Sequence, residues 1–224
     1  MKPGGNTMNR ETLHQTEAKR WIRFLVFFLA LAGVLIEIVT TRLTREIWFL
    51  FRFYTIQTNL LVAFSMLLCL FIRDEKRRYA GIVRLFSNAV ALWILITGIL
   101  YGLLLAGFYH PTGWKSLSNL LMHYVTPLAM VIHELVFSKP IVSVWWLPAV
   151  WVSYPLIYSG VSVLSGLQNG FFPYWFLNPT QNYPQGAGSL LNVGLFVGAM
   201  MIVFVSFGFL MLRFNRRWTR EDAS

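Results

Sequence analysis

Hydrophobic residues fall into six long runs along this chain, and short polar or charged segments separate the runs. Each run has about twenty residues, the length that an α-helix needs to cross the hydrocarbon core of a bilayer. Because the membrane core offers the backbone no water, such spans form helices whose peptide groups bond one another. The pattern predicts an all-α, polytopic integral membrane protein with six transmembrane helices in one domain, residues 21–214. The expected spans are 21–41, 53–72, 82–108, 120–137, 141–164 and 189–212.

Both ends of the chain are polar. We expect residues 1–20 to form a loose N-terminal tail and residues 215–224 to form a basic C-terminal tail. An even number of spans places both tails on one side, which then carries fifteen of the nineteen Lys and Arg residues. The other side carries Arg42, Arg45, Arg52 and Lys115. By the positive-inside rule, this bias predicts that both termini are cytoplasmic.

Composition narrows the classes of protein further. Charged residues make up 12% of the chain, against about 25% in a typical soluble domain, which excludes a water-soluble core. The net charge of +10 comes from basic residues near the ends of the apolar runs, a placement typical of topology signals and contact with anionic lipids. No basic-aromatic module for nucleic acid is present. The single cysteine, Cys69, excludes an intrachain disulfide, and we expect no metal or organic cofactor.

Two polar residues lie at positions where the membrane disfavours them. Thr55 follows the expected outer start of the second span, and His123 follows the outer start of the fourth span. Both spans run in the same direction, so both residues lie within about 5 Å of the outer boundary. A hydroxyl and an imidazole at one depth can act as a nucleophile and its general base. The alternative is structural: a threonine bonded to the preceding turn and a histidine bonded to a backbone carbonyl.

Nearby residues could orient His123. Asn119 lies four residues earlier, on the same helix face, and could hold the imidazole ring. Glu37 lies near the outer end of the first span and falls in the same layer. Its carboxylate could orient His123, or it could pair with Arg42 or Arg45 at the membrane surface, which is the interpretation we favour.

Other polar side chains could stabilise a developing oxyanion. Asn59 shares a helix face with Thr55, and together with Asn119, Tyr101 and Tyr174 it is a candidate hydrogen-bond donor. Aromatic anchoring at the membrane interface is the alternative for both tyrosines. Tyr174 belongs to the long outer connection, residues 165–188, which is rich in aromatic residues and proline and is expected to form a packed cap.

The fourth span contains two further features. Pro127 lies four residues after His123, so we expect the helix to be distorted just below the candidate site. His133 and Glu134 lie near Lys139 at the inner end of the span, where we expect both to be solvated.

Three segments carry a family resemblance: residues 54–59, 123–127 and 173–179, in the order and span placement found here. They resemble the androgen-induced protein family, six-span membrane threonine hydrolases of fatty-acid esters of hydroxy fatty acids with many bacterial relatives. The resemblance extends over about residues 21–214 and follows the bacterial pattern. It implies that Thr55 is the nucleophile, that His123 is the essential histidine, and that the chain resides in a bacterial plasma membrane.

We therefore expect an intramembrane lipid-ester hydrolase that forms an acyl-threonine intermediate. Its partners would be a lipid or fatty-acid ester substrate and the surrounding membrane lipids, without nucleic acid. Two alternatives remain open at this point. One is a membrane acyltransferase that uses the same Thr55 and His123 pair, and the other is a non-enzymatic lipid-binding or transport bundle.

Overall fold

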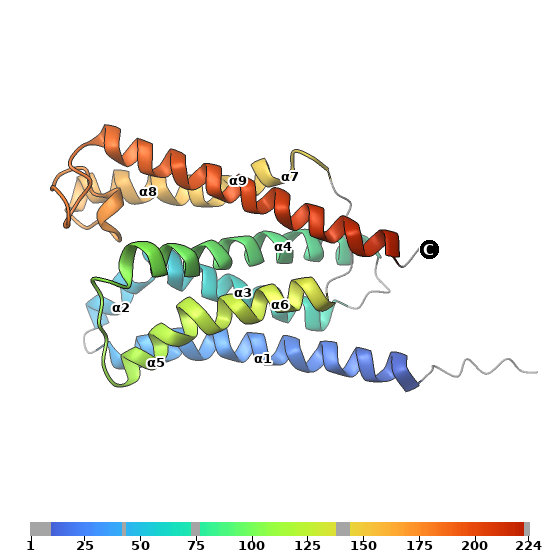
Figure 1. The fold of residues 1–224 in the computed structure, drawn as a ribbon. Helices are drawn as coiled ribbons and strands as arrows, with labels where there is room; N and C mark the ends of the chain where they lie inside the picture. The colour runs from blue at the N-terminus through green and yellow to red at the C-terminus, as the bar shows by residue number, and fades with distance from the viewer. Residues whose placement is uncertain (1–9, 42–43, 73–76, 138–143, 222–224) are drawn as a thin grey trace, which may run out of the picture.

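The computed structural model of the chain describes residues 10–41, 44–72, 77–137 and 144–221 (Figure 1). All regular structure in these residues is helical, and the helices run nearly parallel or antiparallel to one another. The α-helices are α1 (Arg10–Thr40), α2 (Thr44–Leu50), α3 (Tyr54–Phe71), α4 (Arg77–Leu100), α5 (Trp114–Leu120), α6 (Thr126–Phe137), α7 (Leu147–Trp151), α8 (Ser153–Asn169) and α9 (Leu190–Glu221). Two π-helical turns and one 3₁₀ turn join them: η1 (Tyr101–Leu105), η2 (Leu121–Val125) and η3 (Trp175–Leu177).

Six helical stretches are long and apolar enough to cross a membrane, which confirms the all-α, six-helix prediction. The first residues of α1 and the last residues of α9 lie at one end of the bundle, which we call the terminal end (Figure 1). The opposite end, which we call the distal end, carries α2, the start of α5 and the connection between α8 and α9. The six stretches are Thr16–Thr40, Tyr54–Phe71, Tyr79–Leu105, Trp114–Phe137, Leu147–Asn169 and Leu190–Phe214.

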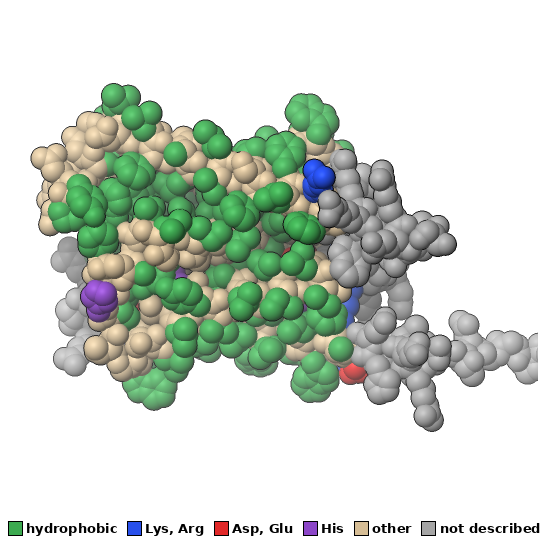
Figure 2. Space-filling view, in the orientation of Figure 1, with side chains coloured by type: hydrophobic (Ala, Val, Ile, Leu, Met, Phe, Trp, Pro, Cys, Tyr) green, Lys and Arg blue, Asp and Glu red, His purple; other side chains and the backbone are tan. Residues whose placement is uncertain are grey.

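The surface of the bundle is apolar. Hydrophobic side chains cover the helices along the face shown in Figure 2, and most of the charged side chains in view lie at the terminal end. Val39 and Leu103 are 81% and 76% exposed, values that an aqueous surface would disfavour. This distribution fits helices that meet lipid along their length, and the protein is a multi-pass membrane protein.

The structure corrects three sequence predictions about helix boundaries. The expectation of a loose tail is wrong for residues 10–20, because α1 begins at Arg10. The segment from Arg10 to Trp21 contains no glycine or proline and is rich in Glu, Gln, Ala, Lys and Arg, which favour helix. For the same reason α9 continues to Glu221, through most of the expected C-terminal tail. The fifth helical stretch begins at Leu147, and the first three residues of the expected span 141–164 lie outside the described residues.

Helices α1, α3, α4 and α6 pack against one another, and α8 and α9 lie beside α4 (Figure 1). Close approach between α1 and the fourth helical stretch depends on Gly33. A Cβ atom at this position would lie 2.7 Å from Cγ of Met122, and the Gly33 carbonyl accepts a hydrogen bond from Ser118 Oγ (2.9 Å). A small residue at a helix crossing and a hydroxyl bonded across it are both typical of packing in membranes.

A buried polar cluster near the terminal end joins α1, α4 and α6. Glu134 on α6 accepts hydrogen bonds from Ser87 Oγ (2.5 Å) and Asn88 Nδ2 (3.0 Å) on α4, and from His133 Nδ1 (3.1 Å). On α1, Arg23 Nε donates to His133 Nε2 (3.4 Å). Because arginine can only donate, Nε2 of His133 is the acceptor and its Nδ1 carries the proton that Glu134 accepts.

The prediction that His133 and Glu134 are solvated is therefore wrong. They are only 1% and 4% exposed. The sequence places them near the end of a span, but it does not show that Arg23 and α4 cover them. Arg23 Nη1 also donates to the Cys69 carbonyl (2.6 Å), one of the last carbonyls of α3, which have no partner within the helix.

We expect Glu134→Ala to lower the free energy of unfolding by about 3–5 kcal/mol, because it leaves three buried donors, on Ser87, Asn88 and His133, without their acceptor. The unfolding transition of the purified protein in detergent measures this change. Glu17→Ala, on the exposed surface of α1, is the matched control and should change stability by less than about 0.5 kcal/mol. Equal stabilities for the two variants would show that the cluster does not hold the helices together.

Candidate functional site

Thr55 and His123 lie in direct contact at the distal end of the bundle. Thr55 Oγ1 is 3.2 Å from His123 Nε2, and the two residues are 8% and 9% exposed. The sequence placed both residues at one depth but did not show whether they touch. The packing of α3 against η2 brings them together.

The surroundings of His123 determine which of its nitrogens carries the proton. His123 Nδ1 lies 3.1 Å from the backbone carbonyl oxygen of Asn119, which can only accept a hydrogen bond. Nδ1 is therefore protonated, and in the neutral imidazole Nε2 is left as an acceptor for the Thr55 hydroxyl. This tautomer is the one that a general base requires.

The local fold around His123 results from Pro127. Proline has no N–H to donate to the carbonyl four residues earlier, which is that of His123, and its ring crowds this carbonyl. The expected distortion is present: residues Leu121–Val125 form the π-helical turn η2, which contains His123. The His123 carbonyl instead faces Gly98 on α4, where a Cβ atom would lie 2.7 Å from the carbonyl oxygen. π-Helical turns are frequent at functional sites because they redirect single side chains.

Thr55 is the second residue of α3, so its backbone N–H belongs to the helix start that has no intrahelical acceptor. Two tyrosine hydroxyls accept these hydrogen bonds instead. The N–H of Tyr54 donates to Tyr158 Oη (3.1 Å), and the N–H of Thr55 donates to Tyr174 Oη (3.3 Å). Residues distant in sequence therefore cap α3, and the positive end of its dipole points at Thr55.

Tyr174 belongs to the connection between α8 and α9, which forms the cap at the distal end. Its Oη lies 3.5 Å from Thr55 Oγ1. Its ring packs on Phe53 and Phe176, with centroid distances of 5.9 and 5.2 Å. Burial raises the pKa of the Tyr174 phenol above its ordinary value, so the group remains a protonated donor through neutral and mildly alkaline pH. Tyr174 is thus in position to donate a hydrogen bond to an oxyanion that develops beside Thr55 Oγ1.

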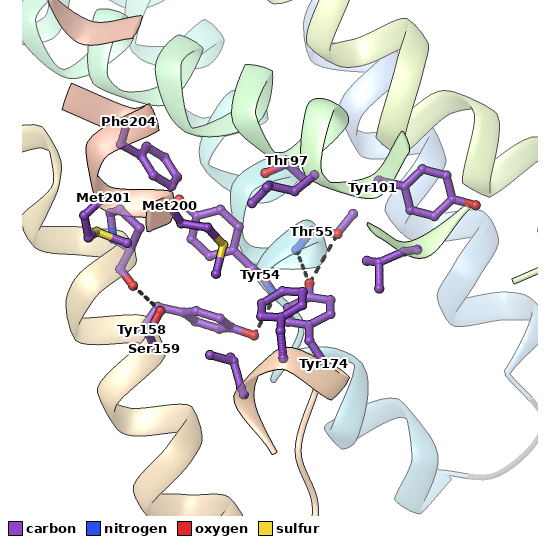
Figure 3. Close-up of a pocket in the computed structure, with 15 residues that line it drawn as sticks. Tyr54, Thr55, Thr97, Tyr101, Tyr158, Ser159, Tyr174, Met200, Met201 and Phe204 are labelled. Atoms are coloured by element: carbon purple, nitrogen blue, oxygen red, sulfur yellow. Dashed lines mark hydrogen bonds between the residues drawn. The ribbon is translucent and has the colours of Figure 1, made fainter. Parts of the chain in front are cut away.

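The other candidate donors have different surroundings. The amide nitrogen of Asn59 donates to the carbonyls of Thr55 (2.9 Å) and Met122 (3.3 Å), so it ties α3 to η2 and has no proton left for an oxyanion. Tyr101 stacks on the His123 ring at a centroid distance of 3.7 Å. Its hydroxyl points away from Thr55 (Figure 3), so it contributes through its ring and not as a donor.

Asn119 and Glu37 also differ from their expected roles. Asn119 holds the His123 ring through its backbone carbonyl, and its side-chain Oδ1 is buried without a hydrogen-bond partner. Glu37 pairs with Lys115 (3.5 Å) and does not contact His123. The alternative partners Arg42 and Arg45 have side chains outside the described part of the structure.

An apolar pocket begins beside Thr55 and extends between α3, α4, α8 and α9 (Figure 3). It contains about 490 Å³ of space not filled by atoms, part of which is open to the surroundings. A water-sized sphere can enter about 50 Å³ of this space, so the pocket is narrow and smaller than the usual ligand pocket of about 300–1,000 Å³. Thr55 lines this pocket while also contacting His123, which lies outside the lining. The lining also includes Tyr158, Tyr174, Met200, Met201 and Phe204.

Sequence analysis missed the contribution of the last two helices. Met200, Met201 and Phe204 look like ordinary apolar residues of α9, and no sequence signal distinguishes them from lipid-facing positions. Tyr158 could have been noticed, because Tyr154 and Tyr158 are spaced by one helical turn within an apolar span. Their ring centroids lie 5.4 and 4.9 Å from that of Tyr54.

No three His, Cys, Asp or Glu side chains in the described ranges come close enough together to hold a metal ion. The polar groups that meet at the site are a threonine, a histidine and a tyrosine beside an apolar pocket. This arrangement can activate a hydroxyl for attack on a carbonyl carbon.

We expect Gly98→Ala to destabilise the protein by about 1–3 kcal/mol, because the added methyl group has no room against the His123 carbonyl. Thermal unfolding in detergent measures this effect. Gly102→Ala is the matched control, one turn further along, where no atom lies within 4 Å of an added Cβ. If both variants unfold at the wild-type temperature, α4 does not depend on Gly98 for its approach to His123.

Comparisons with protein-family models, curated proteins and solved structures find no match for this chain.

Proposed function

We propose that this protein is an intramembrane lipid-ester hydrolase with Thr55 as its nucleophile and His123 as its general base. The observation that carries the proposal is the 3.2 Å contact between Thr55 Oγ1 and His123 Nε2. The Asn119 carbonyl supports it, because it leaves Nε2 unprotonated and turned towards the hydroxyl. The resemblance to membrane threonine hydrolases assigns the same two residues.

In the first half of the reaction, Nε2 of His123 takes the Thr55 proton while Oγ1 attacks the ester carbonyl carbon. The carbonyl electrons move to its oxygen, and a tetrahedral intermediate forms. The intermediate then collapses and breaks the bond between the acyl carbon and the alcohol oxygen. His123 returns the proton to the departing alcohol, and the acyl group remains on Thr55.

In the second half, a water molecule replaces the alcohol. His123 takes a proton from this water as its oxygen attacks the acyl carbon, and the second tetrahedral intermediate releases Thr55. The proton passes from His123 to Thr55 Oγ1, so the enzyme is regenerated and the free acid leaves. The distal position of the site favours this step, because water reaches the membrane boundary but not the centre of the bilayer.

Tyr174 and the start of α3 would stabilise the negative charge that forms on the carbonyl oxygen. The Tyr174 hydroxyl lies 3.5 Å from Oγ1, where it can donate to an oxygen bound to the attacked carbon. One such donor is typically worth about 3 kcal/mol in the transition state. The N-terminal end of α3 adds a favourable dipole at the same position.

The pocket supports a substrate with an apolar acyl chain. Its lining includes Met200, Met201 and Phe204, whose side chains offer dispersion contacts but no hydrogen bonds to a hydrocarbon chain. Lipid or fatty-acid esters in the surrounding membrane are the corresponding substrates. The positive-inside bias further supports a site in the outer leaflet with both termini cytoplasmic, and the bacterial-type resemblance supports a bacterial plasma membrane.

We expect Thr55→Ala to reduce ester turnover by at least about a thousandfold, because it removes the hydroxyl that contacts His123 Nε2. His123→Ala should reduce turnover by about 10²–10⁴, the usual contribution of a general base. Thr55→Ser should retain measurable activity, since it keeps the hydroxyl. The assay is hydrolysis of a panel of long-chain esters in detergent, with mass spectrometry of acid-quenched protein to detect an acyl group on Thr55.

Two results would point elsewhere. Turnover that survives Thr55→Ala would exclude the covalent mechanism, and no wild-type turnover would favour a lipid-binding or transport bundle. Acyl transfer to an added alcohol or amine in preference to water would identify an acyltransferase with the same Thr55 and His123 pair.

We expect Tyr174→Phe to lower kcat by about a hundredfold with little change in KM, because the lost donor acts mainly in the transition state. Tyr158→Phe is the control, since it removes the other hydroxyl that caps α3 without removing a group near Thr55 Oγ1. Steady-state kinetics on both variants measure the difference. Equal losses in the two variants would assign the effect of Tyr174 to helix capping alone.

A further inference from the structure

Arg52 lies at the distal end of the bundle, three residues before Thr55, and its side chain contacts only neutral groups. Its Nη2 donates to Ser165 Oγ (2.5 Å), and both terminal nitrogens lie 3.4 Å from Asn169 Oδ1. Two N–H groups remain, one on Nε and one on Nη1, and neither donates to a described residue. The two partners belong to the last turns of α8, so the guanidinium bridges the start of α3 and the end of α8.

Two aromatic rings lie close to the guanidinium. Its central carbon lies 4.7 Å from the ring centroid of Phe171 and 5.6 Å from that of Phe49. Rings at these distances attract a cation through their quadrupoles. Together with the contacts to Ser165 and Asn169, they hold the charged group in one place, so a ligand that binds it meets a preorganised group.

The charge of Arg52 is not neutralised by an acidic side chain in the described part of the chain. Lys115, at the same end, pairs with Glu37 (3.5 Å), and Arg23 at the terminal end belongs to the cluster that contains Glu134. Arg52 is half-buried at the end of a membrane helix without such a partner. Charged side chains in membrane helices are usually paired, and a guanidinium without an acidic partner keeps its charge and free N–H groups available for an anion.

The surroundings of Arg52 are continuous with those of Thr55. Tyr158 Oη donates to the Arg52 carbonyl (2.9 Å) and accepts from the N–H of Tyr54. Phe171, which faces the guanidinium, packs on Phe53, with ring centroids 5.9 Å apart. A single substrate molecule could therefore place its ester at Thr55 and a charged group at Arg52.

We propose that Arg52 binds the anionic group, a carboxylate or a phosphate, of the amphiphile whose ester reacts at Thr55. The part of this inference that identifies the bound molecule as an ester substrate rests on the proposed function. The anion site itself depends only on the contacts and the charge of Arg52. Guanidinium groups suit both oxyanions, since their planar N–H donors match two oxygens of either group.

Equilibrium binding to the Thr55→Ala protein tests the anion site without any turnover. The probes are palmitate, hexadecyl phosphate and the neutral hexadecanol, each titrated in a non-ionic detergent at mildly alkaline pH. Adding Arg52→Gln should weaken binding of the anionic probes by about tenfold or more and leave hexadecanol unchanged. Arg52→Lys should lose less, because it keeps the charge but not the planar donors. The probe that loses more affinity in Arg52→Gln identifies the oxyanion as carboxylate or phosphate.

A control variant separates the anion site from a change in folding or in net charge. Lys115→Gln removes a cation at the same end that already has a carboxylate partner. It should change binding of the anionic probes by no more than about twofold, and both Lys115→Gln and Arg52→Gln should elute as folded protein. Unchanged binding of both anions in Arg52→Gln would overturn the proposal, as would an equal loss for hexadecanol.

A turnover experiment in protein that retains Thr55 completes the test. Arg52→Gln should raise KM for an ester that carries a free carboxylate or phosphate, but not for the methyl ester or alcohol counterpart of the same substrate. Equal effects on the charged and neutral esters would refute the role of Arg52 in substrate choice. If no ester is hydrolysed while the anionic probes still bind through Arg52, the hydrolase proposal fails and the anion site remains.

Discussion

The lack of water inside a membrane is the constraint on which the rest of this structure depends. Every peptide group that a helix leaves unpaired must find a partner within the protein. At the start of α3, the hydroxyls of Tyr158 and Tyr174 accept the first N–H groups. At its other end, Arg23 donates to the Cys69 carbonyl. The partners that complete α3 come from α1, from α8 and from the cap, so satisfying one helix fixes the positions of three other segments.

The same constraint forms the candidate site. Pro127 removes the donor that the His123 carbonyl would have had, and the chain responds with the π-helical turn η2 against Gly98. The turn directs the imidazole towards Thr55, and the Asn119 carbonyl selects its tautomer. The groups that compensate for an interrupted helix are thus the groups that surround Thr55 and His123. A straight helix without proline would satisfy its own backbone and would leave the imidazole in a different orientation.

The sequence predicts axial positions well, because hydropathy identifies the spans and a helix rises by a fixed distance per residue. This is why Thr55 and His123 could be assigned to one layer before their contact was known. The rotation of a helix about its axis, and the helices that it packs against, do not follow from the local sequence in the same way. Glu134 was expected to be solvated because it lies near the end of a span, yet α4 and Arg23 cover it. Tyr158 was not recognised, because its role depends on the packing of α8 against the start of α3.

The polar cluster around Glu134 and the polar groups around Thr55 and His123 differ in how many of their hydrogen bonds are formed. In the cluster around Glu134, both carboxylate oxygens accept hydrogen bonds, as expected of a network that holds helices together. Five buried side-chain oxygens in the described part of the chain have no partner, and four lie within four residues of Thr55 or His123 in sequence. These four belong to Tyr54, Asn59, Asn119 and Thr126. Since an unsatisfied buried polar group costs about 1–3 kcal/mol, their concentration beside one pair of residues is unfavourable for stability alone. It is the arrangement expected where a substrate or water completes the hydrogen bonds, which supports the proposal that the chemistry takes place at Thr55 and His123.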